Sequence, residues 1–209
     1  MKTLMLVLAV LVFGQEKAPE GAIVLDASQF VHEDGKPCSW PVADGVLEVG
    51  KGSVMTKEKV QDFQMHVEFN IPEPPEGAKD QARSNSGVYI QRRYELQILE
   101  SYGLEPPAFN SCGSIYRQKP PDKNAAKKAG EWQTYDITFK AARFDGAGKK
   151  TESARITVVW NGVKVHDDYE IKDKTGAGKP EGPEAGPILL QDHGAKVRFR
   201  NLWILPKKG

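Results

Sequence analysis

The amino-acid sequence predicts an all-β fold, either a sandwich of two antiparallel sheets or a jelly roll. Short segments that alternate between apolar and polar residues recur along most of the 209-residue chain. Turns rich in Gly, Pro and Asn separate these segments. No segment has a sustained helical period, although Asn124–Lys128 could form one or two helical turns. Many short strands joined by turns, without long helices, are typical of sandwiches and jelly rolls.

The clearest predicted strand is Phe63–Ile71, whose odd-numbered residues are all apolar and whose even-numbered residues are all polar. Such alternation places the two kinds of side chain on opposite faces. The other predicted strands are residues 45–50, 86–91, 94–99, 134–144, 154–171, 186–191 and 195–205. Asn161-Gly162 is a strong hairpin turn because both residues tolerate a positive φ. Arg92-Arg93 forms a second short turn.

The Pro- and Gly-rich segments are predicted to be loops within one domain, residues 15–209, because strands resume on both sides of each. The longest runs from Lys172 to Pro187. A loop of that length in a compact domain is either mobile or functional.

The N-terminus differs from the rest of the chain. One Lys precedes an unbroken apolar run from Leu4 to Phe13, and polar residues follow at once. This run is too short to span a bilayer and is typical of a secretory signal peptide, here residues 1–14. A buried first strand or helix is the alternative. Export to the periplasm or the medium is therefore expected, with no membrane attachment after cleavage.

Composition limits the partners. Lys and Arg number 29 against 28 Asp and Glu, so the net charge of +1 gives no global attraction to nucleic acid or an anionic membrane. Cys38 and Cys112 could form one disulfide in an exported protein or remain two unrelated thiols. Two cysteines without nearby histidines do not predict a zinc site.

Polar residues gather at a few strand ends. In the strand that begins at Tyr94, Glu95 and Gln97 share one face, which is either an ordinary solvated face or part of a binding cleft. Asn85 precedes the partner strand, and Gln191 and His193 share a face two residues apart. Planar hydrogen-bonding groups beside an aromatic ring suit sugar recognition. For each residue a turn or surface role is the alternative.

Other chemistries fit less well. There is no G-x-S-x-G nucleophile motif. Glu95, Gln97 and Glu100 look like a laminarinase-type glucanase motif that has lost its aspartate, which disfavours a retaining mechanism with two close carboxylates. Glu95, Gln97 and His193 could ligate a divalent metal, but their spacing is not diagnostic, and no cofactor is predicted.

Several motifs in combination resemble the 3-keto-disaccharide hydrolase domain family. They are "SNSGVYIQ", "YELQILESYG", "CGSIYRQKPP", "GEWQTYDITFKAARFD" and "GPILLQDHGAKVRFRNLWILP", in order along nearly the whole mature chain. The resemblance implies a concanavalin A-like sandwich in a secreted or periplasmic bacterial protein that acts on oxidised sugars. The turn at Arg92-Arg93 is shorter than in many relatives, so the resemblance does not fix the substrate.

The resemblance also implies roles for individual residues. A ketone at C3 acidifies the C2 proton, so elimination across C2–C1 can expel the glycosidic oxygen before water adds. Glu95 and His193 are the predicted catalytic acid/base residues. The predicted substrate-binding residues are Asn85, Gln97, Gln191, Tyr116 and Arg93. A non-catalytic carbohydrate-binding module is the main alternative, since it has no need for Glu95 and His193 to converge; a structural or adhesive protein is a third.

Overall fold

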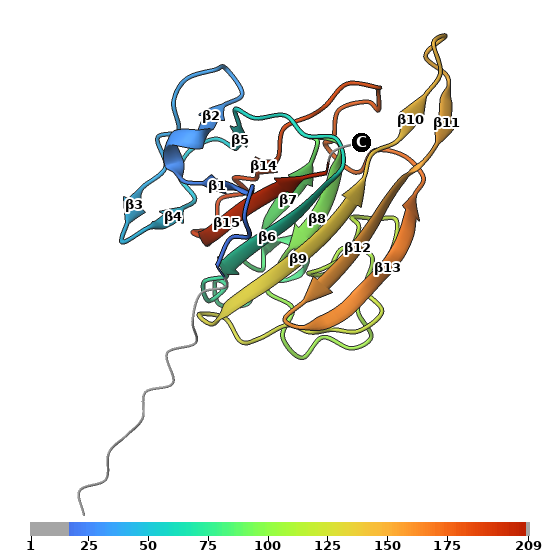
Figure 1. Cartoon of the computed structure of the whole chain (residues 1–209). Coiled ribbons are helices and arrows are strands. Elements are labelled where there is room, and N and C mark those ends of the chain that lie inside the picture. The colour runs from blue at the N-terminus through green and yellow to red at the C-terminus, as the bar shows by residue number, and fades with distance from the viewer. Residues whose placement is uncertain (1–16, 208–209) are drawn as a thin grey trace, which may run out of the picture.

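Two antiparallel sheets enclose a hydrophobic core in the computed structural model, which describes residues 17–207 (Figure 1). The predicted all-β, two-sheet sandwich is confirmed. The predicted signal peptide, residues 1–14, lies outside the described residues.

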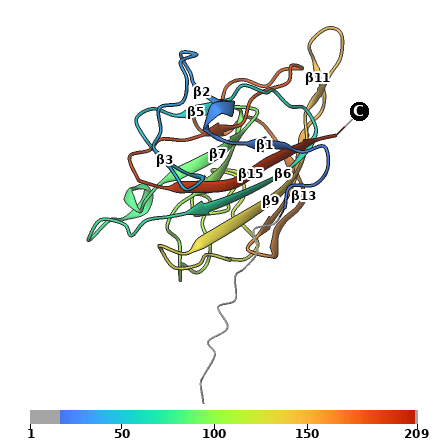
Figure 2. The same cartoon turned by 60° about the vertical axis from the view of Figure 1, so that its left-hand side comes forward.

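The larger sheet has eight strands. Its order is β13 (Val163–Ile171), β12 (Ala154–Trp160), β9 (Trp132–Lys140), β6 (Phe63–Asn70), β15 (Arg198–Pro206), β4 (Val46–Glu48) and β3 (Val42–Ala43), and β1 (Ile23–Leu25) also pairs with β15. Figure 2 shows β9, β6, β15 and β1 running side by side.

The smaller sheet has five strands in the order β2 (Phe30–His32), β5 (Val54–Thr56), β14 (Leu189–Leu190), β7 (Ser86–Ile90) and β8 (Tyr94–Ile98). A separate hairpin of β10 (Arg143–Phe144) and β11 (Lys150–Glu152) extends from one end of the molecule (Figure 1). Two short 3-10 helices, η1 (Ala27–Gln29) and η2 (Asp80–Ala82), were not predicted.

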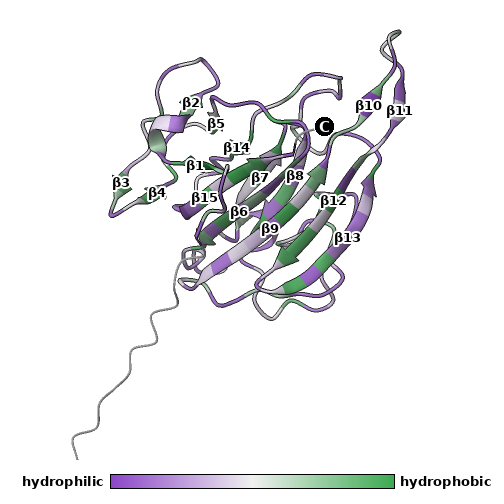
Figure 3. Ribbon diagram, in the orientation of Figure 1, coloured by the Kyte–Doolittle hydropathy of each residue, from purple (hydrophilic) through white to green (hydrophobic). Residues whose placement is uncertain are grey.

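Strand β6 shows why the sequence folds this way. Phe63, Met65, Val67 and Phe69 are all at most 1% exposed and belong to the core between the sheets. Apolar and polar stretches likewise alternate along β9 and β12 (Figure 3). Burying this much apolar surface is the main favourable contribution to folding.

The predicted turns are largely confirmed. Asn161 and Gly162 connect β12 to β13 with φ values of 50° and 80°. The β7–β8 turn is one residue longer than predicted, because Ile90 pairs with Tyr94. Gln91 and Arg92 take the positive φ values there, 52° and 60°.

The helical turns predicted at Asn124–Lys128 do not form. The Asn124 side chain instead donates hydrogen bonds to the carbonyls of Ser101 and Leu104, and accepts one from the Ala126 amide. Such side-chain bonds to the backbone compete with helix formation.

The two cysteines are free thiols. Cys112 is buried with its Sγ 3.1 Å from the Tyr135 hydroxyl, whereas Cys38 is half-buried. The structure therefore contains two separate thiols rather than a Cys38–Cys112 disulfide.

The polar face of β8 is covered rather than solvated, since all five of its residues are buried. Ile115 bridges to Leu96 beside the strand edge, and Thr175 bonds the backbone of Arg93 and Glu95. Leu96 and Ile98 face the core, so Glu95 and Gln97 point the other way. The long loop at residues 172–187 thus helps to enclose the space above Glu95.

Candidate functional site

A cavity of about 170 Å³, here called the sugar-sized cavity, lies over the face of the smaller sheet that is turned away from the core. Five of the predicted site residues line it: Asn85, Glu95, Tyr116, Gln191 and His193. Gln81, Tyr89, Gly176 and Ala177 complete the lining. The structure therefore brings together residues that are more than 100 positions apart in the sequence.

Two predicted substrate-binding residues do not line this cavity. Gln97 is fully buried behind it. Arg93 points elsewhere and donates hydrogen bonds to the carbonyls of Pro180 and Glu184 and to the side chain of Gln91. Arg93 therefore holds the long loop against the hairpin, which is a structural role.

Glu95 is the buried carboxylate of the cavity, only 3% exposed. The Tyr89 hydroxyl donates a 2.8 Å hydrogen bond to Glu95 Oε2, because the two residues are directly paired across β7 and β8. Burial raises the pKa of Glu95 to about 7, although the Tyr89 hydrogen bond and the charge of Arg117 act in the opposite direction. A carboxyl group with such a pKa can both accept and donate a proton near neutral pH.

Two glycines make room for this carboxylate. A Cβ at residue 87 would lie 3.0 Å from Glu95 Oε1 and 3.4 Å from Gln191 Oε1. A Cβ at residue 176 would lie 3.2 Å from Glu95 Oε2, and Gly176 also has a positive φ of 39°. Any larger side chain at either position would crowd the cavity.

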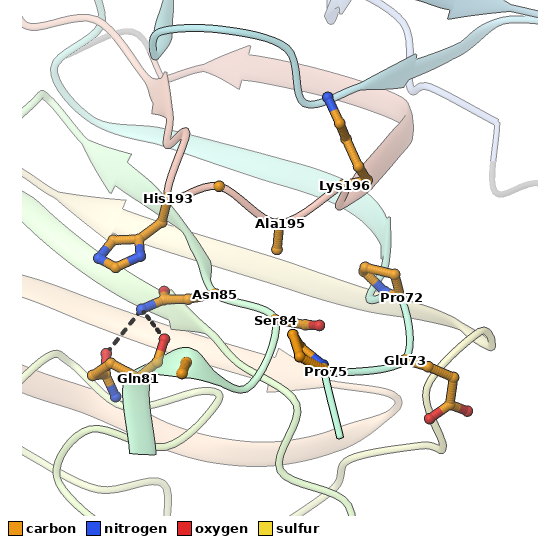
Figure 4. A pocket seen from close by; sticks show the side chains of 11 residues that line it. Pro72, Glu73, Pro75, Gln81, Ser84, Asn85, His193, Ala195 and Lys196 are labelled. Atoms are coloured by element: carbon orange, nitrogen blue, oxygen red, sulfur yellow. Dashed lines mark hydrogen bonds between the residues drawn. The ribbon is translucent and has the colours of Figure 1, made fainter. Parts of the chain in front are cut away.

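A chain of three amide side chains fixes the orientation of Asn85. Gln97 Oε1 accepts a hydrogen bond from the Ile98 backbone N–H, so its Nε2 donates to Gln81 Oε1 at 2.8 Å. Gln81 Nε2 donates to the Asn110 carbonyl. Gln81 Oε1 then also accepts from Asn85 Nδ2 at 3.1 Å (Figure 4). Asn85 Nδ2 also donates to the Gln81 backbone carbonyl at 3.3 Å, so backbone groups anchor all three amides and Asn85 Oδ1 must face away from Gln81.

Two buried oxygens of the cavity have no hydrogen-bond partner among the described residues: Asn85 Oδ1 and Gln191 Oε1. A buried polar atom without a partner costs free energy that a ligand can recover. Both atoms are acceptors, so the fitting ligand is one that brings hydroxyl or N–H donors. A sugar ring is such a ligand.

His193 and Tyr116 lie at the rim. His193 is exposed, and its imidazole lies beside Asn85 and Gln81 (Figure 4). Tyr116 is half-buried, with the guanidinium of Arg117 5.3 Å from its ring centroid. Tyr116 supplies the aromatic surface that sugar binding commonly uses.

Four lining residues were not predicted from the sequence, and two of them, Tyr89 and Gln81, contribute polar side chains. Tyr89 could have been found, because the hairpin register places it opposite Glu95. Gln81 belongs to η2, and no pattern in the sequence indicates that its amide would connect Gln97 with Asn85.

A larger groove of about 610 Å³ adjoins the sugar-sized cavity. Gln81, Asn85 and His193 line both spaces. The remaining groove residues are Pro72, Glu73, Pro75, Ala82, Ser84, Gly194, Ala195 and Lys196.

Residues 17–207 contain no group of three or more His, Cys, Asp or Glu residues that could hold a metal ion. No helix in this part of the chain is long and apolar enough to cross a membrane.

A β-sandwich whose buried carboxylate and unpartnered amide oxygens line a sugar-sized cavity defines a carbohydrate-active class of protein. Residues 20–205 match the model of the 3-keto-alpha-glucoside-1,2-lyase-like domain, and the chain belongs to this 3-keto-disaccharide hydrolase family. The family resemblance is thereby confirmed.

One solved structure supports this family assignment, and two more distant ones share the fold. A "putative glycosyl hydrolase" from Parabacteroides distasonis is 37% identical, with a TM-score of 0.83 over 91% of this chain and 85% of that one. A second protein of that description from the same organism is 18% identical, with a TM-score of 0.63 over 88% and 91%. A variant of the alginate lyase Aly36B in complex with alginate tetrasaccharide shares the fold at 9% identity, with a TM-score of 0.53 over 91% and 99%. No curated protein matches the chain in sequence.

Proposed function

We propose that this protein cleaves 3-keto-glycosides by elimination followed by addition of water. A base removes the C2 proton, and the C2–H electrons form an enolate that the C3 ketone stabilises. The enolate electrons then form the C1–C2 double bond, while the C1–O bond breaks toward the leaving oxygen, which takes up a proton. Water adds across the double bond to give the free keto-sugar.

The observation that carries the proposal is the buried Glu95 carboxylate. In its ionised form it is the base for the C2 proton. Its Oε2 accepts from Tyr89, and its Oε1 lies over the space that Gly87 leaves open. A pKa raised to about 7 makes the carboxylate a stronger base than an ordinary Glu, while about half of it is ionised at pH 7.

His193 is the proposed acid for the leaving oxygen. It lines both the sugar-sized cavity and the larger groove, which is where the glycosidic oxygen of a substrate that spans the two would lie. Histidine is the side chain most often used as a general acid or base in catalysis.

The amides orient the sugar. Asn85 Oδ1 and Gln191 Oε1 are proposed to accept hydrogen bonds from sugar hydroxyls, with the Tyr116 ring at the rim. Gln97 is a positioning residue, because it acts through Gln81 rather than touching the ligand.

The test is turnover of a 3-keto-glucoside beside the unoxidised glucoside, with and without chelator, followed by mass spectrometry. Wild type is expected to cleave only the keto form. Glu95→Gln and His193→Ala should each lower kcat by about 100-fold or more. Glu184→Gln, on an exposed carboxylate, is the matched control.

Wild-type rates in both Glu95→Gln and His193→Ala would contradict the assignment. Saturable binding of the keto-glucoside by calorimetry without any turnover would instead favour a carbohydrate-binding module.

We further propose that the chain is exported, on the basis of the apolar run from Leu4 to Phe13. N-terminal sequencing of protein recovered from periplasm and medium should find a start near Gln15. A start at Met1 in the cytoplasmic fraction alone would refute export.

A further inference from the structure

We infer that the larger groove binds the leaving group, and that it is built for a flat apolar aglycone rather than a second sugar. This inference rests on the proposed function and concerns the substrate class of the same site.

The groove is continuous with the sugar-sized cavity, because Gln81, Asn85 and His193 line both. A glycoside whose sugar ring sits over Glu95 has its glycosidic oxygen near these shared residues. Whatever is attached to that oxygen then extends into the groove.

The far part of the groove is mostly apolar, and the Ser84 hydroxyl is the uncharged polar side-chain group there. Pro72 and Pro75 lie on the segment that follows β6, and Ala195 lies on the segment that enters β15, facing them (Figure 4). Ala82 adds another apolar side chain. Proline rings and alanine methyls offer flat surfaces without hydrogen-bonding groups, which suits an aromatic ring and leaves sugar hydroxyls unpaired.

The two charged residues of the groove do not change this character. Lys196 Nζ donates a 3.0 Å hydrogen bond to the Val49 carbonyl, so its charged group points away from the groove. Only its aliphatic stem lines the groove. Glu73 is exposed, and its side chain points away from Ala195 (Figure 4).

The two spaces therefore differ in chemistry and in size. The sugar-sized cavity has a tyrosine at its rim and two residues with unpartnered acceptors, Asn85 and Gln191, of which only Asn85 also lines the groove. Among the described residues that line the groove there is no Phe, Tyr or Trp on which a second pyranose could stack. At about 610 Å³ against about 170 Å³, the groove has the volume of a drug-sized ligand site and the cavity does not.

The experiment compares benzyl and methyl 3-keto-glucoside, whose leaving alcohols have similar acidity, and a 3-keto-disaccharide. We expect kcat/KM for the benzyl glycoside to exceed that for the methyl glycoside by about tenfold, from burial of the ring. The ratio of kcat/KM for the disaccharide to that for the methyl glycoside should be smaller than the benzyl-to-methyl ratio.

Two variants test the groove itself. Ala195→Asp places a charge on the apolar wall and should lower the benzyl-to-methyl ratio of kcat/KM to near one. Ala82→Asp does the same from another segment and replaces the first variant if that one does not fold. Ala147→Asp, in the exposed β10–β11 turn, is the matched control and should leave the ratio unchanged.

The outcomes separate the two proposals. Cleavage of methyl and benzyl glycosides with equal kcat/KM, or a preference for the disaccharide, would overturn this inference and leave the proposed function standing. Absence of cleavage for every keto-glycoside would overturn the proposed function and this inference with it.

Discussion

Two clusters of buried and half-buried polar side chains lie on opposite sheets of the sandwich and differ in whether their polar groups have hydrogen-bond and ion-pair partners. The outer-sheet cluster, on the face of the larger sheet turned away from the core, comprises His66, Glu68, Asn70, Asp136 and Arg200. The cavity cluster, on the smaller sheet, comprises Asn85, Tyr89, Glu95, Gln97 and Gln191. Glu68 and Glu95 are both nearly inaccessible, at 6% and 3% exposed.

In the outer-sheet cluster the charges are paired. Glu68 accepts from Arg200 at 2.7 Å and from Asn201 at 3.0 Å, and His66 Nδ1 is 2.6 Å from Asp136. In the cavity cluster, the described residues give Glu95 no salt bridge and a single side-chain hydrogen bond, from Tyr89.

This difference in charge pairing indicates a structural role for the outer-sheet cluster and a functional role for the cavity cluster. A buried carboxylate with a cation beside it has its charge compensated within the protein. A buried carboxylate without a neighbouring cation, next to two unpartnered oxygens, is unfavourable in the free protein. A substrate that supplies hydrogen-bond donors recovers this free energy on binding. The comparison predicts opposite behaviour for equivalent substitutions in the two clusters.

The largest expected effect is on the pH dependence of stability. An ordinary Glu has a pKa of 4.5 and Glu95 one of about 7, so the folded state binds more protons between these values. Stability therefore falls as pH rises through this window, by about 3 kcal/mol at most. Glu95→Gln removes the titration, so its free energy of unfolding should rise relative to wild type between pH 5 and pH 8.

Urea denaturation of wild type, Glu95→Gln and Glu184→Gln at both pH values measures this effect. The Glu184→Gln control should follow wild type. A Glu95→Gln curve parallel to wild type would mean that the Glu95 pKa is not raised.

The next largest effect is expected from the same substitution in the outer-sheet cluster, where it should lower stability rather than raise it. Glu68→Gln leaves Arg200 without its carboxylate and should destabilise the fold by about 2 kcal/mol. Cleavage of the 3-keto-glucoside by the folded variant should stay within about twofold of wild type, since Glu68 lies on the other sheet. A loss of activity without a loss of stability would contradict the structural role assigned to Glu68.

A smaller effect is expected from Gly87→Ala. The new methyl would crowd Glu95 Oε1 and Gln191 Oε1, so kcat/KM should fall about tenfold while the melting temperature changes little. Gly146→Ala is the matched control, because a Cβ there meets no atom within 4 Å. Equal activity of the two variants would show that the space over Gly87 is not used by substrate.

The smallest effect concerns Arg117. Its positive charge lowers the pKa of Glu95, so Arg117→Ala should raise that pKa by a fraction of a pH unit above about 7. If ionised Glu95 is the base, kcat/KM rises with pH through this pKa, and the midpoint should move to higher pH in the variant. Arg155→Ala is the control, because Arg155 lies on β12 and forms ion pairs with Asp168 and Glu170 of β13. A shift to lower pH would contradict the role of Arg117.

Much of the fold followed from local patterns. The alternation in Phe63–Ile71 and the Asn161-Gly162 turn are properties of neighbouring residues, and both are found as predicted. The very short strands β1, β2, β3, β5 and β11 were missed, because three residues or fewer carry too little alternation to recognise.

The candidate site was only partly predictable. Glu95 and Gln97 were correctly placed on one face of a strand, since side chains alternate with period two. Gln97 and Arg93 were expected to bind substrate, yet Gln97 lies behind Gln81 and Arg93 bonds the long loop. The side-chain types that suit a ligand also suit these structural bonds, so the sequence could not separate the two uses.

By itself, then, the sequence determined the strands, the turns and which residues share a face, because these depend on backbone geometry over a few residues. Only the tertiary structure decided which polar groups remain without partners. That depends on contacts between distant segments: Thr175 over Glu95, Gly87 beneath Gln191, and Gln81 between Gln97 and Asn85. These contacts bury Glu95, raise its pKa and leave the amide oxygens facing the cavity.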